Sequence, residues 1–121
     1  MTKKKVLIVD DDSRNIFALS ATLRAKGFDC VSSLSAEDAL RLLNSDEAID
    51  AVLLDMMMPE MDGYEAIPLI KQIPSRVGVP VISVTALAML GDKEKCLAAG
   101  ADGYISKPID VDKLLQLLST I

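Results

Sequence analysis

Continuous apolar runs alternate with amphipathic segments along the chain. The runs "VLIV" (6–9), "AVLL" (51–54) and "VPVISV" (79–84) are apolar throughout, which is typical of strands covered on both faces, as in a parallel sheet. The runs "FDCVS" (28–32) and "GYIS" (103–106) are shorter and more polar, which favours positions at the edges of a sheet. The pattern therefore predicts five strands, with the three apolar ones in the middle.

The segments between these runs have apolar residues at helical spacing. Ser13 and Gly27 are the predicted start and stop of the first helix, whereas Ser35 and Asp110 are the predicted N-caps of the second and the last. The apolar faces of these three helices consist of Ile16, Leu19 and Leu23, then Ala36, Leu40 and Leu43, then Val111, Leu114, Leu115 and Leu118. Each face is wide enough to cover a sheet.

Two further helical segments are less regular. Residues 87–99 form the weakest predicted helix, because Gly91 lies inside it and charged residues interrupt its apolar face; low local stability makes it a candidate moving part. Pro68 falls inside "GYEAIPLIKQI" (63–73), the predicted third helix. If that helix begins near Asp62, Pro68 lies past the first turn and removes a hydrogen bond or bends the helix.

Strands alternating with helices predict an α/β fold with right-handed crossovers and helices on both faces of the sheet. The flavodoxin-like, doubly wound (βα)5 order 2-1-3-4-5 fits three buried strands between two polar ones, and in this order ligands bind beyond the carboxyl ends of strands 1 and 3. The 121 residues contain no linker or repeat, so we expect a single domain over residues 1–121.

Composition argues against several functions. Hydrophobic residues make up 50% of the chain and aromatic residues only 3%, and His is absent, which indicates an aliphatic core and excludes His-based catalysis and most zinc sites. A net charge of −5 argues against nucleic-acid binding. Cys30 and Cys96 have no metal-type spacing and are interpreted as reduced thiols. Without a transmembrane-length run or a signal peptide, we expect a cytoplasmic protein that does not associate with membranes.

Polar side chains occur where the predicted strands end. Because the carboxyl ends of parallel strands meet at one edge of a sheet, we expect these side chains to converge. Carboxylates about 4 Å apart repel by about 4 kcal/mol at an effective dielectric of about 20, so such a cluster favours a bound cation. The residues concerned are Asp10, Asp11, Asp12, Asp55, Thr85, Tyr104 and Lys107.

These residue types suit phosphoryl chemistry. Two or three carboxylates plus water form the hard oxygen site that Mg²⁺ prefers, usually completed by phosphate oxygens. A neighbouring carboxylate can attack phosphorus to form an aspartyl phosphate. A lysine and a threonine hydroxyl can then hold the phosphoryl oxygens.

Four segments, "VLIVDDD", "LLDMMMPEMDGYE", "VISVTA" and "GADGYISKP", together resemble the receiver domain of two-component response regulators over essentially the whole chain. The resemblance implies a phosphorylation-operated switch that accepts its phosphoryl group from a histidine kinase or a histidine phosphotransfer protein. Such a domain catalyses only its own phosphorylation and dephosphorylation. The stretch "SRNIFALSATLRAKGF" resembles receivers attached to hybrid sensor histidine kinases, and both a stand-alone receiver and an excised domain stay open.

The resemblance also implies a role for each acid. Asp55 is the phosphoacceptor, and Asp11 binds Mg²⁺ directly. Asp10 helps through water or as a second acidic ligand. The backbone carbonyl of Met57 completes the protein ligands.

The remaining roles concern the phosphoryl group and the switch. By resemblance, Thr85 and Lys107 hold the phosphoryl oxygens, Tyr104 turns inward when Thr85 is drawn to the phosphate, and the bond from Lys107 to Pro108 is cis. The face built by the fourth helix, fifth strand and fifth helix is expected to bind partners or a second copy of the domain. The loop after Asp55 is shaped by Met58, Pro59 and Gly63. Neither Met57 nor Leu87 can orient water, which predicts slow self-dephosphorylation.

Structural explanations compete with some of these roles. Asp12 is interpreted as an acid at a helix N-terminus, favoured by the helix dipole. Thr85 on its own could be an ordinary strand residue, Lys107 a surface lysine and Tyr104 an edge-strand tyrosine. The methionines 56, 57, 58 and 61 are interpreted as loop and core residues, because Mg²⁺ prefers oxygen ligands.

Three other functions are alternatives to the switch. A haloacid-dehalogenase-like phosphatase also combines an Asp nucleophile with Mg²⁺, but its D-x-D-x-T motif would start at Asp10 and meet Arg14 instead of threonine. A flavin-binding module of the same topology lacks a hydroxyl-rich phosphate loop after the first strand. A phosphorylation-independent scaffold receiver conflicts with the intact set of site residues.

Overall fold

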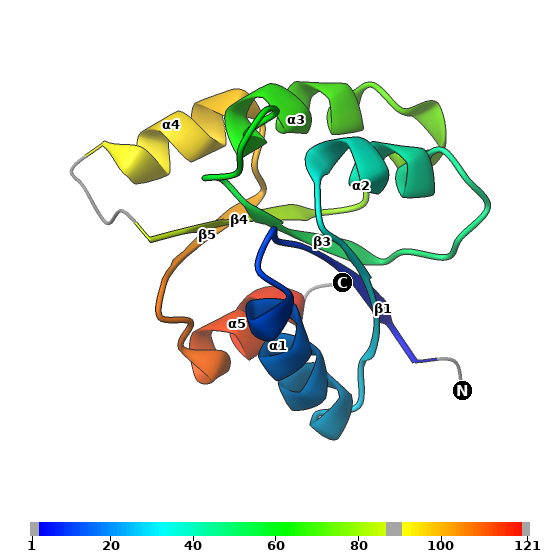
Figure 1. Cartoon of the computed structure of the whole chain (residues 1–121), viewed down its shortest axis with the longest axis vertical. Coiled ribbons are helices and arrows are strands. Elements are labelled where there is room, and N and C mark those ends of the chain that lie inside the picture. Colours follow the sequence, from blue (N-terminus) through cyan, green and yellow to red (C-terminus); the bar gives the residue numbers. More distant parts are fainter. Residues whose placement is uncertain (1–2, 87–90, 120–121) are drawn as a thin grey trace.

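The computed structural model describes residues 3–86 and 91–119, and within these ranges five parallel strands form one sheet in the order β2-β1-β3-β4-β5 (Figure 1). The predicted α/β fold and its flavodoxin-like strand order are confirmed, and the two polar strands lie at the edges as expected. The strands are β1 (Lys5–Val9), β2 (Asp29–Ser33), β3 (Ala51–Asp55), β4 (Val81–Thr85) and β5 (Gly103–Ser106).

Helices cover both faces of this sheet. Helices α1 and α5 lie on one face, and α2, α3 and α4 lie on the other (Figure 1). Their bounds are α1 (Ser13–Ala25), α2 (Ala36–Leu43), α3 (Gly63–Lys71), α4 (Asp92–Ala99) and α5 (Val111–Leu118), with a short 3₁₀ turn η1 (Pro74–Arg76) before β4. None of the helices in the described ranges combines the length and the apolar character that crossing a bilayer requires.

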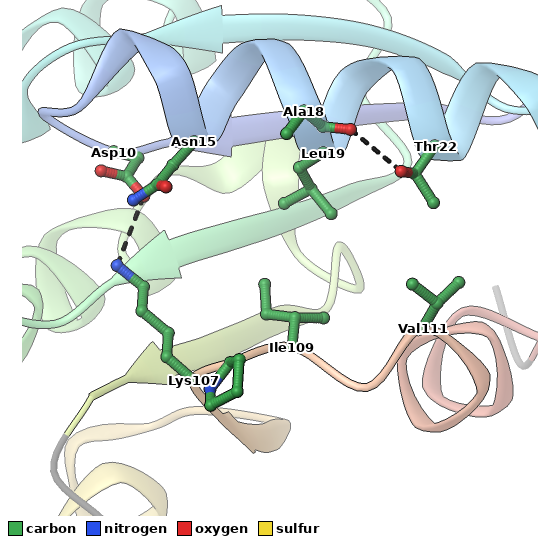
Figure 2. A pocket seen from close by; sticks show the side chains of 9 residues that line it. Asp10, Asn15, Ala18, Leu19, Thr22, Lys107, Ile109 and Val111 are labelled. Carbon is green, nitrogen blue, oxygen red and sulfur yellow. Dashed lines mark hydrogen bonds and ion pairs between the residues drawn. The ribbon is translucent and has the colours of Figure 1, made fainter.

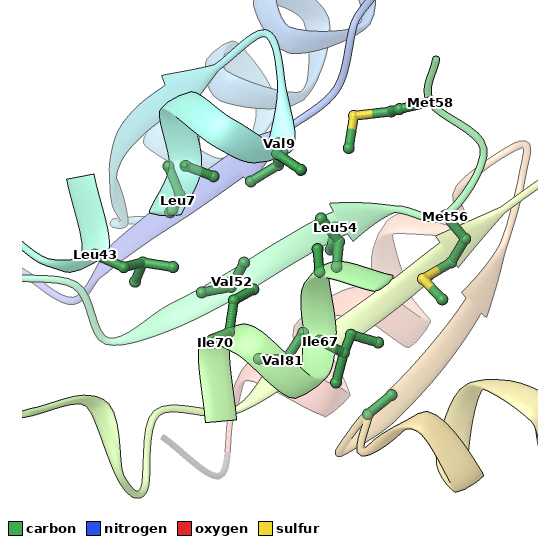
Figure 3. Packing of buried hydrophobic residues seen from close by; sticks show 14 of the residues in the cluster. Leu7, Val9, Leu43, Val52, Leu54, Met56, Met58, Ile67, Ile70 and Val81 are labelled. Carbon is green, nitrogen blue, oxygen red and sulfur yellow. The ribbon is translucent and has the colours of Figure 1, made fainter. Parts of the chain in front are cut away.

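Two aliphatic clusters fill the space between the sheet and its helices. Alternate residues of each central strand face opposite sides, so Leu54 packs under α2–α4 while Leu53 packs under α1 and α5. Figure 3 shows the first cluster, in which Leu7 and Leu54 of the sheet meet Ile67 of α3. The continuous apolar runs of β1, β3 and β4 are therefore explained by burial on both faces.

The N-caps agree with the predictions in two helices and differ in one. Ser35 caps α2 by accepting the N–H of Asp38 at 3.1 Å, and Asp110 caps α5. The cap of α1 is Asp12, not Ser13, because Ser13 is already helical while the extended Asp12 accepts the Arg14 N–H at 2.9 Å. The interpretation of Asp12 as a helix-terminal acid is confirmed.

Helix α3 continues through its proline. Asp62 and Glu65 form a capping box, so the helix begins at Gly63 and Pro68 does lie past the first turn. The ring removes the N–H that would have bonded the Tyr64 carbonyl. Pro68 is on the exposed side of the helix, where water can replace that bond, and α3 runs on to Lys71.

Helix α4 is shorter than expected. It begins at Asp92, and Gly91 is its N-cap in a left-handed conformation (φ 93°) that a helix interior does not allow. The prediction that placed Gly91 inside the helix was therefore wrong. The earlier part of that prediction, including Leu87, lies outside the described residues.

Arg76 fixes the connection between α2 and β3 from a distance. Its guanidinium donates to the carbonyl oxygens of Leu43 (2.8 Å), Ser45 (3.0 Å) and Glu47 (2.7 Å). One side chain of η1 thus donates to three carbonyl groups at and after the end of α2. The last carbonyl groups of a helix have no N–H partner within the helix, so they need donors from elsewhere.

Candidate functional site

The two buried acids of the site lie at the carboxyl ends of neighbouring strands: Asp10 directly follows β1, and Asp55 is the last residue of β3. Val9 and Leu54 are register partners in β1 and β3, which places Asp10 and Asp55 side by side at the carboxyl edge of the sheet. Asp10 is 7% exposed and Asp55 is 6% exposed, and both are surrounded by the ends of buried strands. The topology thus brings together carboxylates that are 45 positions apart in the sequence.

Asp11 completes an acidic cluster. One carboxylate oxygen from each of Asp10, Asp11 and Asp55 lies within 4.8 Å of the others. Asp11 is exposed, so the cluster opens to solvent on one side and is closed by protein on the other. Buried oxygens with one accessible side suit a hard cation that keeps part of its water shell.

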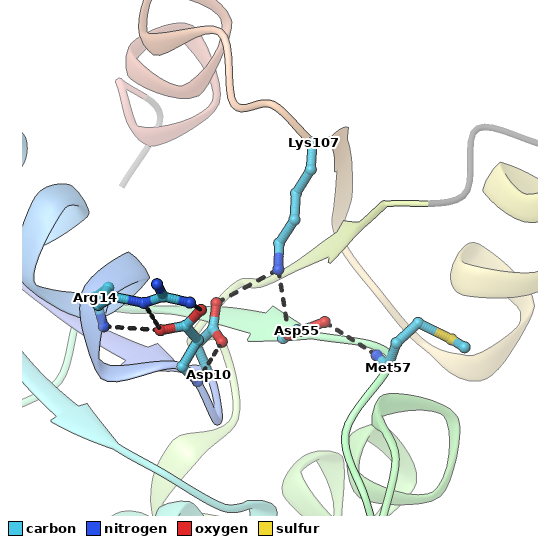
Figure 4. Close-up of polar contacts among 6 residues, drawn as sticks. Asp10, Arg14, Asp55, Met57 and Lys107 are labelled. Atoms are coloured by element: carbon cyan, nitrogen blue, oxygen red, sulfur yellow. Dashed lines mark hydrogen bonds and ion pairs between the residues drawn. The ribbon is translucent and has the colours of Figure 1, made fainter.

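Lys107 reaches this cluster from the segment after β5. Its ammonium lies 3.3 Å from Asp55 Oδ2 and 3.5 Å from Asp10 Oδ2, and it points between the two carboxylates in Figure 4. The cation is therefore shared between two buried acids that would otherwise repel each other.

Backbone N–H groups orient both buried carboxylates. Asp55 Oδ1 accepts the Met57 N–H at 3.0 Å, and Asp10 Oδ1 accepts the Asp12 N–H at 2.9 Å. Each acid thus presents one oxygen to the backbone and the other to Lys107 (Figure 4). The Met57 side chain is exposed, so only its backbone contributes to this arrangement.

Burial and charge act in opposite directions on these groups. Burial raises the pKa of Asp55 above its ordinary value, and the nearby charge of Asp10 raises it further, while the Met57 N–H and Lys107 partly offset the rise. Burial lowers the pKa of Lys107, but the charges of Asp55 and Asp10 outweigh that effect and raise it overall. The site therefore holds closely packed charges that a divalent cation would help to balance.

The other predicted residues surround the cluster. Thr85 is buried at the end of β4, and its carbonyl accepts the Lys107 N–H at 2.7 Å. Tyr104 is half-buried on β5, and desolvation raises its pKa, with further contributions from Asp92, Cys96 and Glu94. The Lys107–Pro108 peptide bond is cis.

The loop after Asp55 is held by a close approach between two residues. A side chain at Gly63 would place its Cβ 2.8 Å from the Met56 Cα, and the Gly63 N–H donates to the Met56 carbonyl at 3.1 Å. Met58 is buried and Pro59 is exposed. Among the methionines, 56 and 58 pack into the core, as the sequence predicted.

Two features beside the cluster were not predicted from the sequence. Arg14 pairs with Asp12 at 3.3 Å and places a guanidinium at the rim of the site (Figure 4). The spacing Asp-x-Arg at a helix start was the available signal.

The second unpredicted feature is a pocket of about 510 Å³ between α1 and the segment that leads into α5. Asp10, Asn15 and Lys107 lie at one end of it, whereas Leu19 and Ile109 line its apolar part (Figure 2). Its residues come from segments more than 80 positions apart, which no local pattern could reveal.

The donor set fits Mg²⁺. Three carboxylates within 4.8 Å of one another, two of them buried and held by N–H groups, supply the oxygen ligands that this ion prefers. The part of the chain that the structure describes has no histidine or cysteine in this cluster, so the donor chemistry does not suit zinc.

Sequence comparison identifies similar proteins. The family model of the response regulator receiver domain matches residues 6–119. The sensor histidine kinase RcsC of Salmonella typhi is 40% identical over 114 residues, which cover 94% of this chain and 12% of that protein. The chain thus spans a small part of the curated relatives that it matches.

Solved structures agree with this result. The receiver domain of the sensor histidine kinase PA1611 from Pseudomonas aeruginosa, solved with a magnesium ion in its active-site cleft, is 32% identical, with a TM-score of 0.84 and coverage of 98% of this chain and 97% of that one. The BeF3-activated DrrB receiver domain is 33% identical, with a TM-score of 0.81 and the same coverage.

Proposed function

Because this chain belongs to the response regulator receiver domain family, it is a signalling domain of two-component systems, and we propose that phosphorylation of Asp55 operates it as a switch. The observation that carries this proposal is the position of the buried Asp55 carboxylate. It lies in one cluster with Asp10 and Asp11 and 3.3 Å from the Lys107 ammonium. Residues 1–121 would then constitute one receiver domain.

We assign Mg²⁺ binding to the carboxylates of Asp10, Asp11 and Asp55 and to the backbone carbonyl of Met57. When bound, the ion would neutralise the carboxylates and the oxygens of an incoming phosphoryl group. The magnesium ion in the PA1611 receiver supports this assignment by similarity.

The reaction is a transfer of a phosphoryl group between two side chains. Asp55 Oδ2, the carboxylate oxygen that faces Lys107, attacks phosphorus. The P–N bond to the donor imidazole breaks, and the imidazole leaves with the bonding electron pair and takes up a proton. The N–H of Met57 holds the other oxygen of Asp55 during the attack. Lys107 shifts from Asp55 to a phosphoryl oxygen, and the Thr85 hydroxyl donates to another.

The signal would leave the site through Thr85 and Tyr104. Thr85 ends β4 and Tyr104 lies in the adjacent strand β5, so a movement of Thr85 toward the phosphoryl group changes the space beside Tyr104. The face formed by α4, β5 and α5 would then shift between two arrangements and bind a partner or a second copy of the domain.

The phosphodonor would be a histidine kinase or a histidine phosphotransfer protein. The similarity to RcsC supports an origin in, or a partnership with, a hybrid sensor histidine kinase. The domain would be regulatory, acting in the cytoplasm without contacting nucleic acid or membrane. Slow self-dephosphorylation stays the expectation, because the Met57 side chain beside the site has no group that can orient water.

Incubation with acetyl phosphate, followed by intact mass measurement, tests this proposal. We expect one phosphoryl addition that requires Mg²⁺ and disappears in Asp55→Asn. Asp12→Asn is the matched control, because Asp12 caps α1 and lies outside the cluster; it should be labelled like the parent protein. Equal labelling of Asp55→Asn would place the acceptor elsewhere, and steady turnover of phosphate esters would favour the haloacid-dehalogenase-like alternative.

A further inference from the structure

Helix α4 is held to the domain by a single buried side chain. Of its eight residues only Cys96 is buried, with 0% exposure, whereas the next apolar residue, Leu97, is 43% exposed. Cys96 is therefore the only fully buried apolar contact of α4, and the partly buried Ala99 packs beside it.

The C-terminal end of α4 is held by close packing and by hydrogen bonds of the residues that follow it. At the C-terminal end, Gly100 lies against α3, since a Cβ there would be 3.1 Å from Ile67. Asp102 follows and accepts from the Lys71 ammonium and from the Val81 N–H at 2.9 Å. The C-terminal end of α4 is therefore anchored to both α3 and β4. At the other end, Gly91 provides no side-chain cap.

The Cys96 thiol also links α4 to α3. Its Sγ lies 3.9 Å from the Tyr64 hydroxyl oxygen, to which the thiol donates a weak hydrogen bond. Burial, and next the contact with Cys96, raise the pKa of Tyr64 to about 12, so the phenol stays neutral. The link between the two helices is thus a soft contact without charge.

A buried hydroxyl on the same face of the sheet has no hydrogen-bond partner among the residues that the structure describes. Ser83 is 0% exposed, and its Oγ makes no hydrogen bond in the structure of the described residues. Ser83 is the register partner of Tyr104, on the face that α3 and α4 cover. An unpaired buried hydroxyl destabilises the arrangement in which it is buried, so this arrangement is easier to leave.

We propose that Cys96 is the positioning residue that holds α4 against the sheet, so that its packing sets how readily α4 moves when Asp55 is phosphorylated. The proposal rests on the proposed function and adds a specific residue to it. Its consequence is a thiol that is inaccessible in the resting domain and reacts when α4 lifts.

Thiol reactivity with DTNB measures this movement. The Cys96 thiolate attacks the reagent disulfide, a mixed disulfide forms, and the nitrothiobenzoate thiolate leaves and is measured by its colour. In Cys30→Ala, which retains Cys96, we expect beryllofluoride with Mg²⁺ to accelerate the reaction by about tenfold, because opening of α4 becomes more populated.

Cys30 is the matched control thiol. It is also buried but lies in β2 and packs in the cluster under α1 and α5. In Cys96→Ala, which retains Cys30, beryllofluoride should leave the rate unchanged. An unchanged Cys96 rate, or equal acceleration of both thiols, would overturn the proposal.

The affinity for beryllofluoride is a second measurement, which distinguishes an effect of Cys96 on the position of α4 from a general effect on the stability of the domain. Cys96→Leu overfills the space under α4 and should favour the lifted position, so by linkage it should bind beryllofluoride about threefold to tenfold more tightly. Cys30→Leu overfills the other cluster and should not. Cys96→Ser, close in size to the parent, should retain the parent affinity; Cys96→Val serves if the leucine variant does not fold.

Fluorine NMR of bound beryllofluoride distinguishes failure of this inference from failure of the proposed function. If no Mg²⁺-dependent bound signal appears, or if Asp55→Asn retains it, the assignment of Asp55 fails. If the ligand binds through Asp55 while Cys96 stays protected and Cys96→Leu binds like the parent, only the role of Cys96 fails.

Discussion

Helices α2 and α4 have the same length of eight residues and cover the same face of the sheet, yet they are attached differently. Helix α2 buries Ala36, Ala39 and Leu43 and has a side-chain cap at Ser35. Helix α4 buries only Cys96 and lies between two glycines in the left-handed conformation, Gly91 and Gly100. The first has the features of a scaffold and the second those of a movable part.

The difference shows how one fold can combine a fixed site with a mobile face. The acids of the site lie at the carboxyl ends of β1 and β3, which are in the middle of the sheet, whereas α4 packs near β5 at its edge. Stability is uneven within a domain, and segments with few buried contacts open at lower free energy. We therefore expect substitutions in α2 and α4 to have clearly different effects.

The largest effect should come from shortening the buried anchor of α2. Leu43→Ala should lower the free energy of unfolding by about 2–5 kcal/mol, because it removes buried methyl groups and leaves a cavity. Leu97→Ala in α4 removes the same atoms from a partly exposed position and should change it by no more than about 0.5 kcal/mol. Urea unfolding followed by circular dichroism measures both, and equal losses would contradict the contrast.

Loss of the α2 cap should have a smaller effect. Ser35→Ala leaves the Asp38 N–H without its acceptor and should cost about 1 kcal/mol of unfolding free energy. Ser13→Ala is the control, since Asp12 and not Ser13 caps α1, and it should change stability by less than about 0.5 kcal/mol. A large loss in the Ser13 variant would mean that α1 begins differently.

Removing the unpaired hydroxyl beneath the α3–α4 side should be neutral or slightly stabilising. Ser83→Ala removes a buried polar group that has no hydrogen bond within residues 3–86 and 91–119, so the free energy of unfolding should stay equal or rise by up to about 1 kcal/mol. The change in the free energy of unfolding is thus expected to be zero or positive for Ser83→Ala, whereas it is negative for Ser35→Ala. Thermal unfolding of the two variants in parallel checks this, and a clear loss in Ser83→Ala would reveal a partner for the hydroxyl.

The last effect concerns the contact between α3 and α4, and near neutral pH it is absent. Above pH 10 the unfolded chain loses the Tyr64 proton while the folded chain keeps it, because burial and Cys96 raise the pKa in the folded state to about 12. Stability should therefore fall as the pH rises from about 10 to about 12. Tyr64→Phe should weaken this dependence, measured as the shift of the urea midpoint with pH; an unchanged slope would exclude Tyr64 as its source.

Strand positions and strand order could be predicted because strands buried on both faces have continuous apolar sequences, whereas edge strands are more polar. Val6 to Val9 and Ala51 to Leu54 are apolar without alternation, and both strands lie in the middle of the sheet. The start of α4 could not be predicted in this way. A glycine inside an apolar pattern is compatible with a helix interior and with a left-handed cap, and only the backbone conformation of Gly91 decides between them.

The residues that make up the candidate site could also be predicted from the sequence, whereas the contacts among them could not. Given the strand order, Asp10, Asp11 and Asp55 had to meet at one edge. The Lys107 ammonium contacts both Asp10 and Asp55. These two acids are 97 and 52 positions away from Lys107 in the sequence, so no local pattern could reveal the contacts. That Ser83 finds no hydrogen-bond partner in the described part of the chain likewise follows from three-dimensional packing, and no residue pattern predicts it.

The three hydrogen bonds from the Arg76 guanidinium to backbone carbonyl oxygens have a practical consequence for building chimaeras of this domain. The turn from α2 into β3 is local in sequence, but its shape depends on a guanidinium about 30 positions downstream. A chimaera that takes this turn from a relative would also need the relative's residue at position 76. Without it, the carbonyl groups of the turn would lose their hydrogen-bond donor. Sequence boundaries and transferable modules are therefore not the same thing in this protein.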